Sequence, residues 1–158
     1  MRYITIDFEK YWKIAVNFRK DSFEVSFGNE TDFDEADYLS WLQEKIAEFP
    51  DGFVFAMEEG KIIGQLELSL IKFEGRNIGY VNLYYLEPSS RGRGKGQEFH
   101  EYAMQFFKTR TVAEYHLRVA PTNTPALKFY QKVGMAEMCA EVDGKVIRMK
   151  GQVEGFGV

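Results

Sequence analysis

The sequence predicts an α+β fold with a mixed, mostly antiparallel sheet of six or seven strands, flanked by four helices. Three strand-like runs follow one another between residues 53 and 86 with short turns between them, which is typical of antiparallel neighbours. A helical pattern then separates two further strand-like runs, and that order predicts one parallel crossover. The 158 residues are 45% apolar and include 14 Phe and 9 Tyr, so we expect one domain, spanning residues 1–158, with a substantial core.

The first fifty residues predict one strand and two helices. Residues 2–6 are typical of a short strand, and the apolar residues from Phe8 to Phe18 recur at helical spacing. A second helix is expected over residues 33–49, because its apolar positions fall on one stripe and Pro50-Asp51-Gly52 stops it.

The middle of the chain predicts three strands, a helix and a fourth strand. Residues 53–58 and 61–73 are joined at Glu59-Gly60, a typical hairpin turn, and the third strand covers residues 78–86. After a glycine-rich loop, an amphipathic helix is expected to bury Phe99, Tyr102, Ala103, Phe106 and Phe107, and residues 114–120 predict the next strand.

The last forty residues predict a capped helix and a closing hairpin. Thr124 is expected as the N-cap with Pro125 at the first helical position, and Gly134 is placed to end the helix. Residues 135–142 and 145–150 then predict a hairpin across Asp143-Gly144.

The loop Arg91-Gly92-Arg93-Gly94-Lys95-Gly96 predicts a site for an anion such as pyrophosphate. It lies between a strand and a helix, and in that position glycines expose backbone N–H groups while the helix start adds the positive end of a dipole. Its spacing is neither that of a P-loop, which needs Gly-Lys-Ser/Thr, nor that of a Gly-x-Gly-x-x-Gly dinucleotide fold.

Composition excludes several classes of protein. A net charge of −4 argues against a general nucleic-acid binder, and the single Cys139 with two distant histidines predicts neither disulfides nor a metal site. Because the sequence shows no signal-peptide core and no apolar run of about 20 residues, we expect a soluble cytoplasmic protein that does not bind membranes. We also expect Cys139 to be buried and His100 to face solvent.

Two motifs in this order resemble the GCN5-related N-acetyltransferase (GNAT) superfamily. Residues 91–96 match its Arg/Gln-x-x-Gly-x-Gly/Ala loop. Its second signature, Val-x-x-x-Asn-x-x-Ala-x-x-Phe-Tyr-x-x-x-Gly-Phe, is matched except at its last position, where Met135 replaces Phe; the matching residues are Val119, Asn123, Ala126, Phe129, Tyr130 and Gly134. The likeness covers nearly the whole chain, and it is weaker before residue 50 and after residue 150.

The resemblance implies a GNAT-like fold and an N-acetyltransferase that moves an acetyl group from acetyl-coenzyme A (acetyl-CoA) to a primary amine by direct attack in a ternary complex. It implies that Tyr84, Leu86 and Asn123 contact the cofactor arm. The backbone of Arg91, Gly92, Arg93, Gly94, Lys95 and Gly96 would hold the pyrophosphate, and Tyr130 would be the catalytic general acid.

The general base stays open. Many family members carry Glu at the position of Arg118, and the third strand offers Tyr80, Asn82 and Tyr84, expected on one face, but no carboxylate. Glu67 is one candidate, although an outward, solvated Glu is the commoner explanation. A chain of water molecules that removes the proton is the other option.

The acceptor and the partners stay open as well. Nine acidic residues against one basic residue between Asp21 and Pro50 suggest an acidic cleft wall for a cationic small-molecule or peptide amine, with an ordinary solvated surface as the alternative. A non-catalytic acyl-CoA sensor or interaction module is the alternative function. The tail from Val153 to Val158 is a candidate contact in a homodimer.

Overall fold

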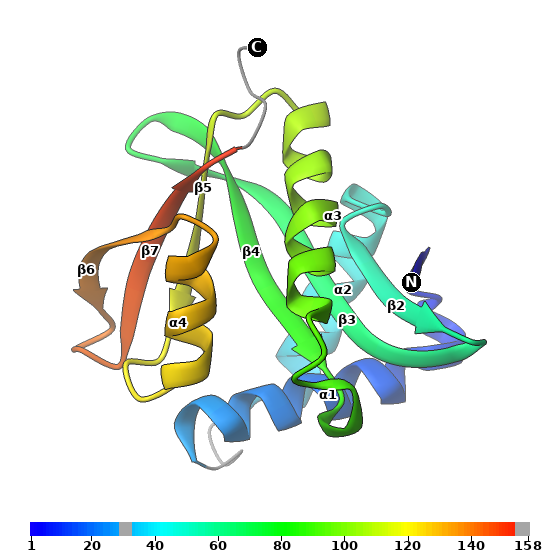
Figure 1. Ribbon diagram of the computed structural model, residues 1–158. Coiled ribbons are helices and arrows are strands. Elements are labelled where there is room, and N and C mark those ends of the chain that lie inside the picture. Colours follow the sequence, from blue (N-terminus) through cyan, green and yellow to red (C-terminus); the bar gives the residue numbers. More distant parts are fainter. Residues whose placement is uncertain (29–32, 154–158) are drawn as a thin grey trace.

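A seven-stranded mixed sheet forms the centre of the protein, with the strand order β1-β2-β3-β4-β5-β7-β6 (Figure 1). The computed structural model describes residues 1–28 and 33–153, so the expected tail contact of residues 154–158 lies outside the described part. The strands are β1 (Arg2–Thr5), β2 (Phe53–Glu58), β3 (Lys61–Phe73), β4 (Arg76–Leu86), β5 (Glu114–Val119), β6 (Ala136–Glu141) and β7 (Val146–Gln152). Every neighbouring pair is antiparallel except β4 and β5, which confirms the predicted fold class and its one parallel crossover.

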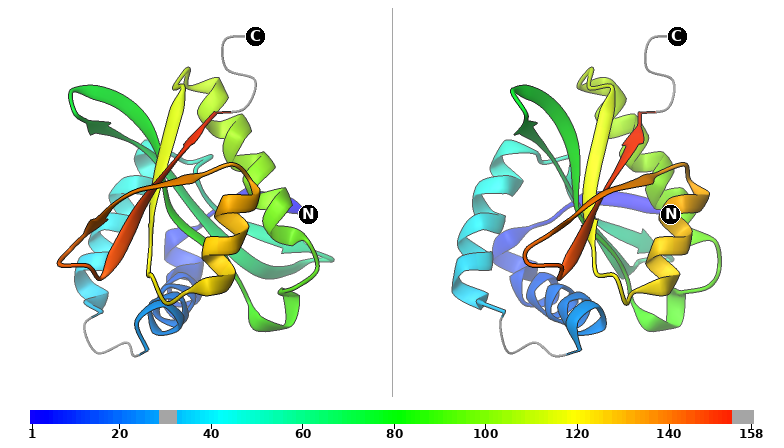
Figure 2. Two further views of the ribbon diagram at one scale, coloured as in Figure 1. Left: turned by 60° about the vertical axis from the view of Figure 1, so that its left-hand side comes forward. Right: turned by 90° about the vertical axis from the view of Figure 1, so that its left-hand side faces the viewer.

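Four α-helices cover the two faces of the sheet (Figure 2). They are α1 (Phe8–Phe27), α2 (Glu35–Glu48), α3 (Lys95–Thr109) and α4 (Thr124–Lys132), and a short 3₁₀ turn, Pro88–Ser90, precedes the glycine loop. Helices α1 and α2 lie on one face, and α3 and α4 lie on the other (Figure 2). None of the helices in the described ranges combines the length and the apolar content that a membrane span requires.

Helix α1 is longer than the apolar pattern predicts. It begins after Asp7, whose side chain accepts a hydrogen bond from the Lys10 N–H, and it continues past Phe18 to Phe27, where Gly28 ends it in the left-handed conformation (φ 82°). The extension carries Arg19, Ser22 and Ser26, which line a cavity together with residues of β4. Its polar residues face that cavity rather than the core, and the apolar periodicity therefore ends before the helix does.

Helix α3 packs very closely on β4. A Cβ atom on Gly79 would lie 2.5 Å from the ring of Phe107, so the absence of a side chain on β4 lets the buried ring approach the backbone. His100, on the same helix, is buried, contrary to the expectation from the sequence. The buried face of α3 is wider than its apolar stripe, so it includes His100.

Strands β4 and β5 separate after a short paired segment. They pair only from Gly79 to Val81 on β4, opposite residues 115–117 of β5, although β4 continues to Leu86. Beyond Val81, no strand in the described ranges pairs with this edge of β4, so backbone N–H and C=O groups face an opening in the sheet.

A β-bulge at Asn82 reverses the side-chain alternation of β4. Leu83 pairs with Glu67 and Val81 pairs with Leu68, so Asn82 is the extra residue. Tyr80, before the bulge, lies under the guanidinium of Arg148, whereas Tyr84, after it, packs against Phe99 of α3. The prediction that Tyr80, Asn82 and Tyr84 share one face is therefore wrong, because one inserted residue moves Tyr84 to the opposite face.

The C-terminal elements follow the predicted order with two differences. The N-cap of α4 is Asn123 rather than Thr124, and its side chain accepts the N–H of Ala126 at 3.4 Å. Cys139 lies on β6, the edge strand of the sheet, and is exposed instead of buried. A strand at the edge receives cover from one neighbour only, and its sequence does not reveal that position.

Candidate functional site

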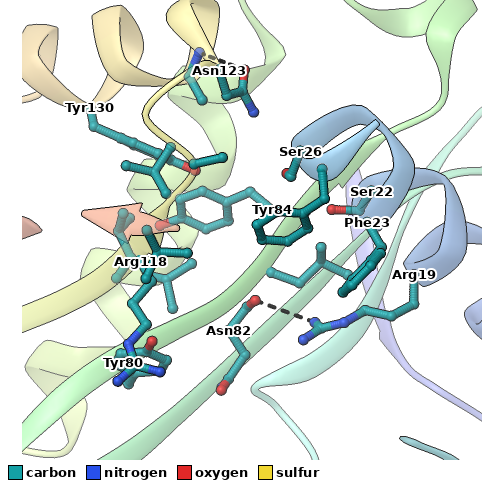
Figure 3. Close-up of a pocket in the computed structure, with 18 residues that line it drawn as sticks. Arg19, Ser22, Phe23, Ser26, Tyr80, Asn82, Tyr84, Arg118, Asn123 and Tyr130 are labelled. Atoms are coloured by element: carbon teal, nitrogen blue, oxygen red, sulfur yellow. Dashed lines mark hydrogen bonds between the residues drawn. The ribbon is translucent and has the colours of Figure 1, made fainter. Parts of the chain in front are cut away.

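The opening between β4 and β5 leads into a cavity of about 480 Å³ (Figure 3). Its walls come from α1, β4, β5, the loop after β5 and α4, so residues from both faces of the sheet meet there. The polar and aromatic residues that line it are Arg19, Ser22, Phe23, Ser26, Phe27, Tyr80, Asn82, Tyr84, Arg118, Asn123 and Tyr130. The splayed strands thus create a passage through the sheet instead of a pocket on one surface.

Tyr130 reaches this cavity from α4, and Asn123 positions the helix. The cap hydrogen bond of Asn123 fixes the start of α4, and Tyr130 lies on the helix face directed to the sheet (Figure 3). Burial raises the pKa of the Tyr130 phenol to about 12, because the charged form loses its hydration. Tyr130 therefore keeps its proton at neutral pH and can act as a donor.

Tyr84 lies in the same cavity, on the α3 and α4 side of the sheet. Its hydroxyl is buried without a hydrogen-bond partner among the described residues, and burial raises its pKa well above the ordinary value. A buried hydroxyl without a partner is destabilising, so a ligand or a water molecule that accepts its hydrogen bond would stabilise this site.

The glycine loop has the geometry of an anion cradle. Gly92 and Gly94 adopt positive φ angles of 79° and 76°, and Gly94 is the N-cap residue of α3. The first N–H groups of α3 have no acceptor within the helix, as at every helix start. A Cβ on Gly96 would lie 3.1 Å from the Phe129 ring, so this glycine lets α3 and α4 approach each other.

Two of the three long side chains of the loop already have protein partners. Arg91 donates from Nε to the Leu86 carbonyl at 2.8 Å and from Nη2 to Asp21 at 3.2 Å. Lys95 forms an ion pair with Glu58 across the end of the β2–β3 hairpin. These two side chains anchor the loop, whereas its backbone and the exposed Arg93 face solvent, where an anion can reach them.

Glu67 is buried and engaged, not solvated. Its carboxylate forms an ion pair with Arg19, accepts the Tyr38 hydroxyl at 2.5 Å and accepts Gln65 Nε2 at 2.8 Å. Arg19 also donates to the Asn82 carbonyl at 3.3 Å, which links this cluster to the bulge (Figure 3). Burial raises the pKa of Tyr38 well above its usual value, and the adjacent Glu67 carboxylate adds to that effect.

On the other side of the cavity, Arg118 is held by a second, partly exposed cluster. Arg118 Nε donates to Glu141 at 2.8 Å, and Arg148 Nε donates to both oxygens of the same carboxylate at 3.0 Å. Burial opposes ionisation of Glu141, but the hydrogen bonds from Arg148 and Arg118 outweigh it and lower its pKa. One carboxylate therefore serves two guanidinium groups.

His116 completes this cluster as a neutral imidazole. Arg148 Nη1 lies 2.9 Å from His116 Nδ1, and because arginine can only donate, Nδ1 is the acceptor. The Nε2 atom then carries the proton and donates to Glu114. Burial lowers the pKa of His116, which agrees with the neutral form. No sequence motif points to this series of hydrogen bonds, because its members are far apart along the sequence.

The acidic residues of the N-terminal helices do not line this cavity, within the described residues. Asp21 is bound by Tyr85 and Arg91, and Glu35 forms an ion pair with Lys20. Asp34 and Asp37 line a separate shallow groove between α1 and α2. Glu30 and Asp32 lie outside the described residues.

The residues predicted for the site therefore fall into two groups. Tyr84, Asn123 and Tyr130 line the cavity. Leu86 and Arg91 line a smaller adjoining hollow that shares Tyr84 and Asn123 with it, and the glycines and Lys95 form the loop beyond β4. The structure adds Arg19, Ser22 and Ser26 to the cavity, and no motif in the sequence points to these residues. Tyr80 and Asn82, which the sequence places on the third strand, line the cavity as well.

Fold and sequence together define the family. The sequence profile of the acetyltransferase (GNAT) family matches residues 12–135. The fold agrees with this match, because the seven-stranded sheet splays after one parallel pairing and a glycine loop precedes the crossover helix. The chain belongs to this family.

Two relatives illustrate the range of the match. An uncharacterized N-acetyltransferase of Methanocaldococcus jannaschii is 27% identical over 103 residues, which cover 63% of this chain and 44% of that protein. The mycothiol acetyltransferase of Catenulispora acidiphila is 29% identical over 107 residues, which cover 64% of this chain and 34% of that protein. The matched segment thus spans less than half the length of these relatives.

Solved structures share the fold over almost the whole chain. The ribosomal-protein-alanine N-acetyltransferase from Brucella melitensis superposes with a TM-score of 0.73 at 19% identity, covering 96% of this chain and 99% of that one. The PaiA N-acetyltransferase from Thermoplasma acidophilum, solved in complex with coenzyme A, gives a TM-score of 0.72 at 19% identity, covering 96% and 98%. At this identity, the likeness establishes the fold.

Proposed function

We propose that this protein is an acetyl-CoA-dependent N-acetyltransferase that acetylates a primary amine, on a small molecule or a peptide, by direct attack in a ternary complex. The observation that carries the proposal is the meeting of three features at one opening in the sheet. These are the unpaired edge of β4, the glycine loop beyond it, and the protonated phenol of Tyr130. Membership of the acetyltransferase family supports the same activity.

The residues present fit the cofactor. The edge of β4 after Val81 has no strand partner among the described residues, so its backbone groups can pair with the amide-bearing pantetheine arm as an added strand would, with Tyr84 and Leu86 beside it. The backbone of residues 91–96 would hold the pyrophosphate at the start of α3, and Asn123 would contact the arm while capping α4. Bound there, acetyl-CoA supplies a thioester carbonyl that a neutral amine can attack.

Tyr130 is the proposed general acid. As the carbon–sulfur bond breaks, the sulfur becomes a thiolate, and the Tyr130 hydroxyl would donate a proton to it. The amine loses one proton when the amide forms, and that proton restores the phenol, so the reaction needs no external acid. Backbone N–H groups on the open edge of β4 would stabilise the oxyanion that precedes bond cleavage.

Proton removal from the amine is proposed to proceed through water. Among the described residues, no carboxylate lines the cavity, and Glu67 is occupied by Arg19, Tyr38 and Gln65. The hydroxyls of Ser22, Ser26 and Tyr80 offer positions for such water molecules. We expect much of the rate to come from holding the two substrates in contact.

The activity is tested by the release of free coenzyme A thiol in the presence of an amine panel. The panel contains a free amino acid, a peptide N-terminus, a lysine peptide, spermidine and an aminoglycoside. Acetyl-CoA should bind, and at least one amine should accelerate thiol release above the rate of hydrolysis. Acetyl-CoA binding without transfer to any member of the panel would instead favour the second candidate, a non-catalytic acyl-CoA sensor. One observation supports this candidate, namely that no carboxylate base among the described residues lines the cavity.

A further inference from the structure

The charged side chains that line the cavity, among the described residues, are both cationic. Arg19 and Arg118 are the arginines that line it, and no acidic side chain among the described residues does. The charge of Arg19 is balanced by Glu67, whose side chain is 0% exposed. Arg118 and Arg148 share the carboxylate of Glu141, so this carboxylate cannot occupy all the donors of both guanidinium groups.

Arg118 is placed to present its guanidinium to a ligand. Its side chain is 43% exposed, whereas that of Arg148 is 7% exposed, so Arg118 carries the accessible guanidinium of the pair. Its Nε atom is bound by Glu141, which fixes the orientation of the guanidinium plane. Its two Nη groups contact no acceptor within residues 1–28 and 33–153, which leaves two parallel donors of the kind that bind a carboxylate.

The support behind Arg118 is rigid. Glu141 accepts from Arg148, and Arg148 in turn donates to the neutral ring of His116, which donates to Glu114 on β5. This chain crosses β6, β7 and β5, so Arg118 is held against the sheet instead of projecting freely. Preorganisation of this kind lowers the entropy that a ligand loses when it binds.

We infer that the acceptor is a small amine that also carries a carboxylate, an α-amino acid or a close analogue, with the carboxylate on the Nη groups of Arg118. The inference rests on the proposed acetyl transfer and names its substrate class. The cavity of about 480 Å³ must also contain the acyl end of the cofactor, so the space beside Arg118 suits a molecule of amino-acid size. Tyr130 and Arg118 line the same cavity, which lets the amine face the thioester while the carboxylate is held (Figure 3).

The test compares acceptors that differ only in the anionic group. A set of amino acids, their amides and their aminophosphonate analogues is assayed for kcat/KM across pH, so that each amine is compared in its neutral form. We expect the carboxylate to exceed the amide by about 10- to 100-fold, the range for a hydrogen bond to a charged group. Preference for the phosphonate would assign the site to a phosphate-like anion and overturn the carboxylate assignment.

Variants then attribute the preference to Arg118. Arg118→Gln should remove the preference for carboxylate over amide, chiefly through a KM that rises more for the acid than for the amide. Arg118→Lys should keep part of the preference for carboxylate, since a single ammonium group replaces a guanidinium that can donate two hydrogen bonds to one carboxylate. Lys128→Gln, on the exposed side of α4 and outside the cavity, serves as the matched loss of one positive charge and should leave the ratio unchanged.

Binding separates this inference from the proposed activity. Calorimetry with the coenzyme A-saturated protein should detect the N-acetylated amino acid, with affinity lost in Arg118→Gln. Transfer to neutral or cationic amines with no advantage for the carboxylate would overturn the inference and leave the acetyltransferase activity standing. If no amine is acetylated but the N-acetylated amino acid still binds through Arg118, the proposed activity is wrong and the ligand assignment holds. If neither acetylation nor binding is detected, both the activity and the ligand assignment are wrong.

Discussion

At the scale of single residues, the site depends on side chains whose neighbours fix their protonation. Tyr130 stays protonated because burial disfavours the phenolate, and His116 stays neutral because Arg148 occupies its Nδ1 atom. Asn123 caps α4 and lines the cavity at the same time. A variant at any of these positions changes both local structure and chemistry, so each needs a control that separates the two.

Removal of the Tyr130 hydroxyl tests the general acid. Tyr130→Phe should lower kcat by about 100-fold or more, the usual contribution of general acid catalysis, with KM for acetyl-CoA changed by no more than about twofold. Tyr102→Phe removes a hydroxyl bonded to the Asp51 carbonyl outside the cavity and should keep kcat. Equal turnover in Tyr130→Phe and the wild-type protein would exclude the assignment.

The pH profile gives an independent check on the same residue. Because the pKa of Tyr130 is about 12, its protonated form persists through the working range, and the rate should rise with pH as the amine loses its proton. No descending limb from Tyr130 is expected below about pH 10. A limb near neutral pH that disappears in Tyr130→Phe would contradict the raised pKa.

At the scale of elements, close packing without side chains holds α3 on the sheet. Gly79→Ala would place a Cβ atom 2.5 Å from the Phe107 ring and should lower the free energy of unfolding by about 1 to 3 kcal/mol, as overpacking does. Denaturant unfolding measures the loss. The double variant Gly79→Ala/Phe107→Leu should recover part of it, and purely additive losses would place the strain elsewhere.

The elements also show which features were predictable. The order of elements along the chain and the one parallel crossover follow from local patterns of Gly, Pro and apolar residues, and the structure confirms them, although the N-cap of α4 is Asn123 instead of Thr124. The bulge at Asn82 was not predictable, because it exists only in the pairing of β4 with β3. A motif in the sequence points to Asn123 and Tyr130, and the family resemblance adds Tyr84, whereas the clusters around Glu67 and Glu141 depend on contacts between distant segments.

At the scale of the whole molecule, two parts of the sheet meet through few contacts. In the part of the chain that the structure describes, backbone pairing joins strands β1 to β4 to strands β5 to β7 only through the three residue pairs of β4 and β5. A ligand in the opening contacts both parts and should therefore stabilise the whole molecule.

Thermal unfolding with acetyl-CoA measures this coupling. At about 100 times its dissociation constant, the cofactor should add about 2.7 kcal/mol and raise Tm by about 5 to 10 °C. Gly92→Val strains a residue at φ 79° in the loop and should reduce the shift, whereas Gly75→Val imposes the same kind of strain at φ 81° in the distant β3–β4 turn. Equal shifts in both variants would exclude the loop from binding.

The opening between β4 and β5 also sets stability against activity. Extending their ladder from Val81 to Leu86 would add hydrogen bonds worth about 0.5 to 1.5 kcal/mol each and would seal the passage that the substrates need. Selection for thermal stability alone would therefore favour variants in which the two strands close together. A screen of such variants would yield proteins with a higher Tm that have lost the proposed activity, since the site exists only where the sheet is incomplete.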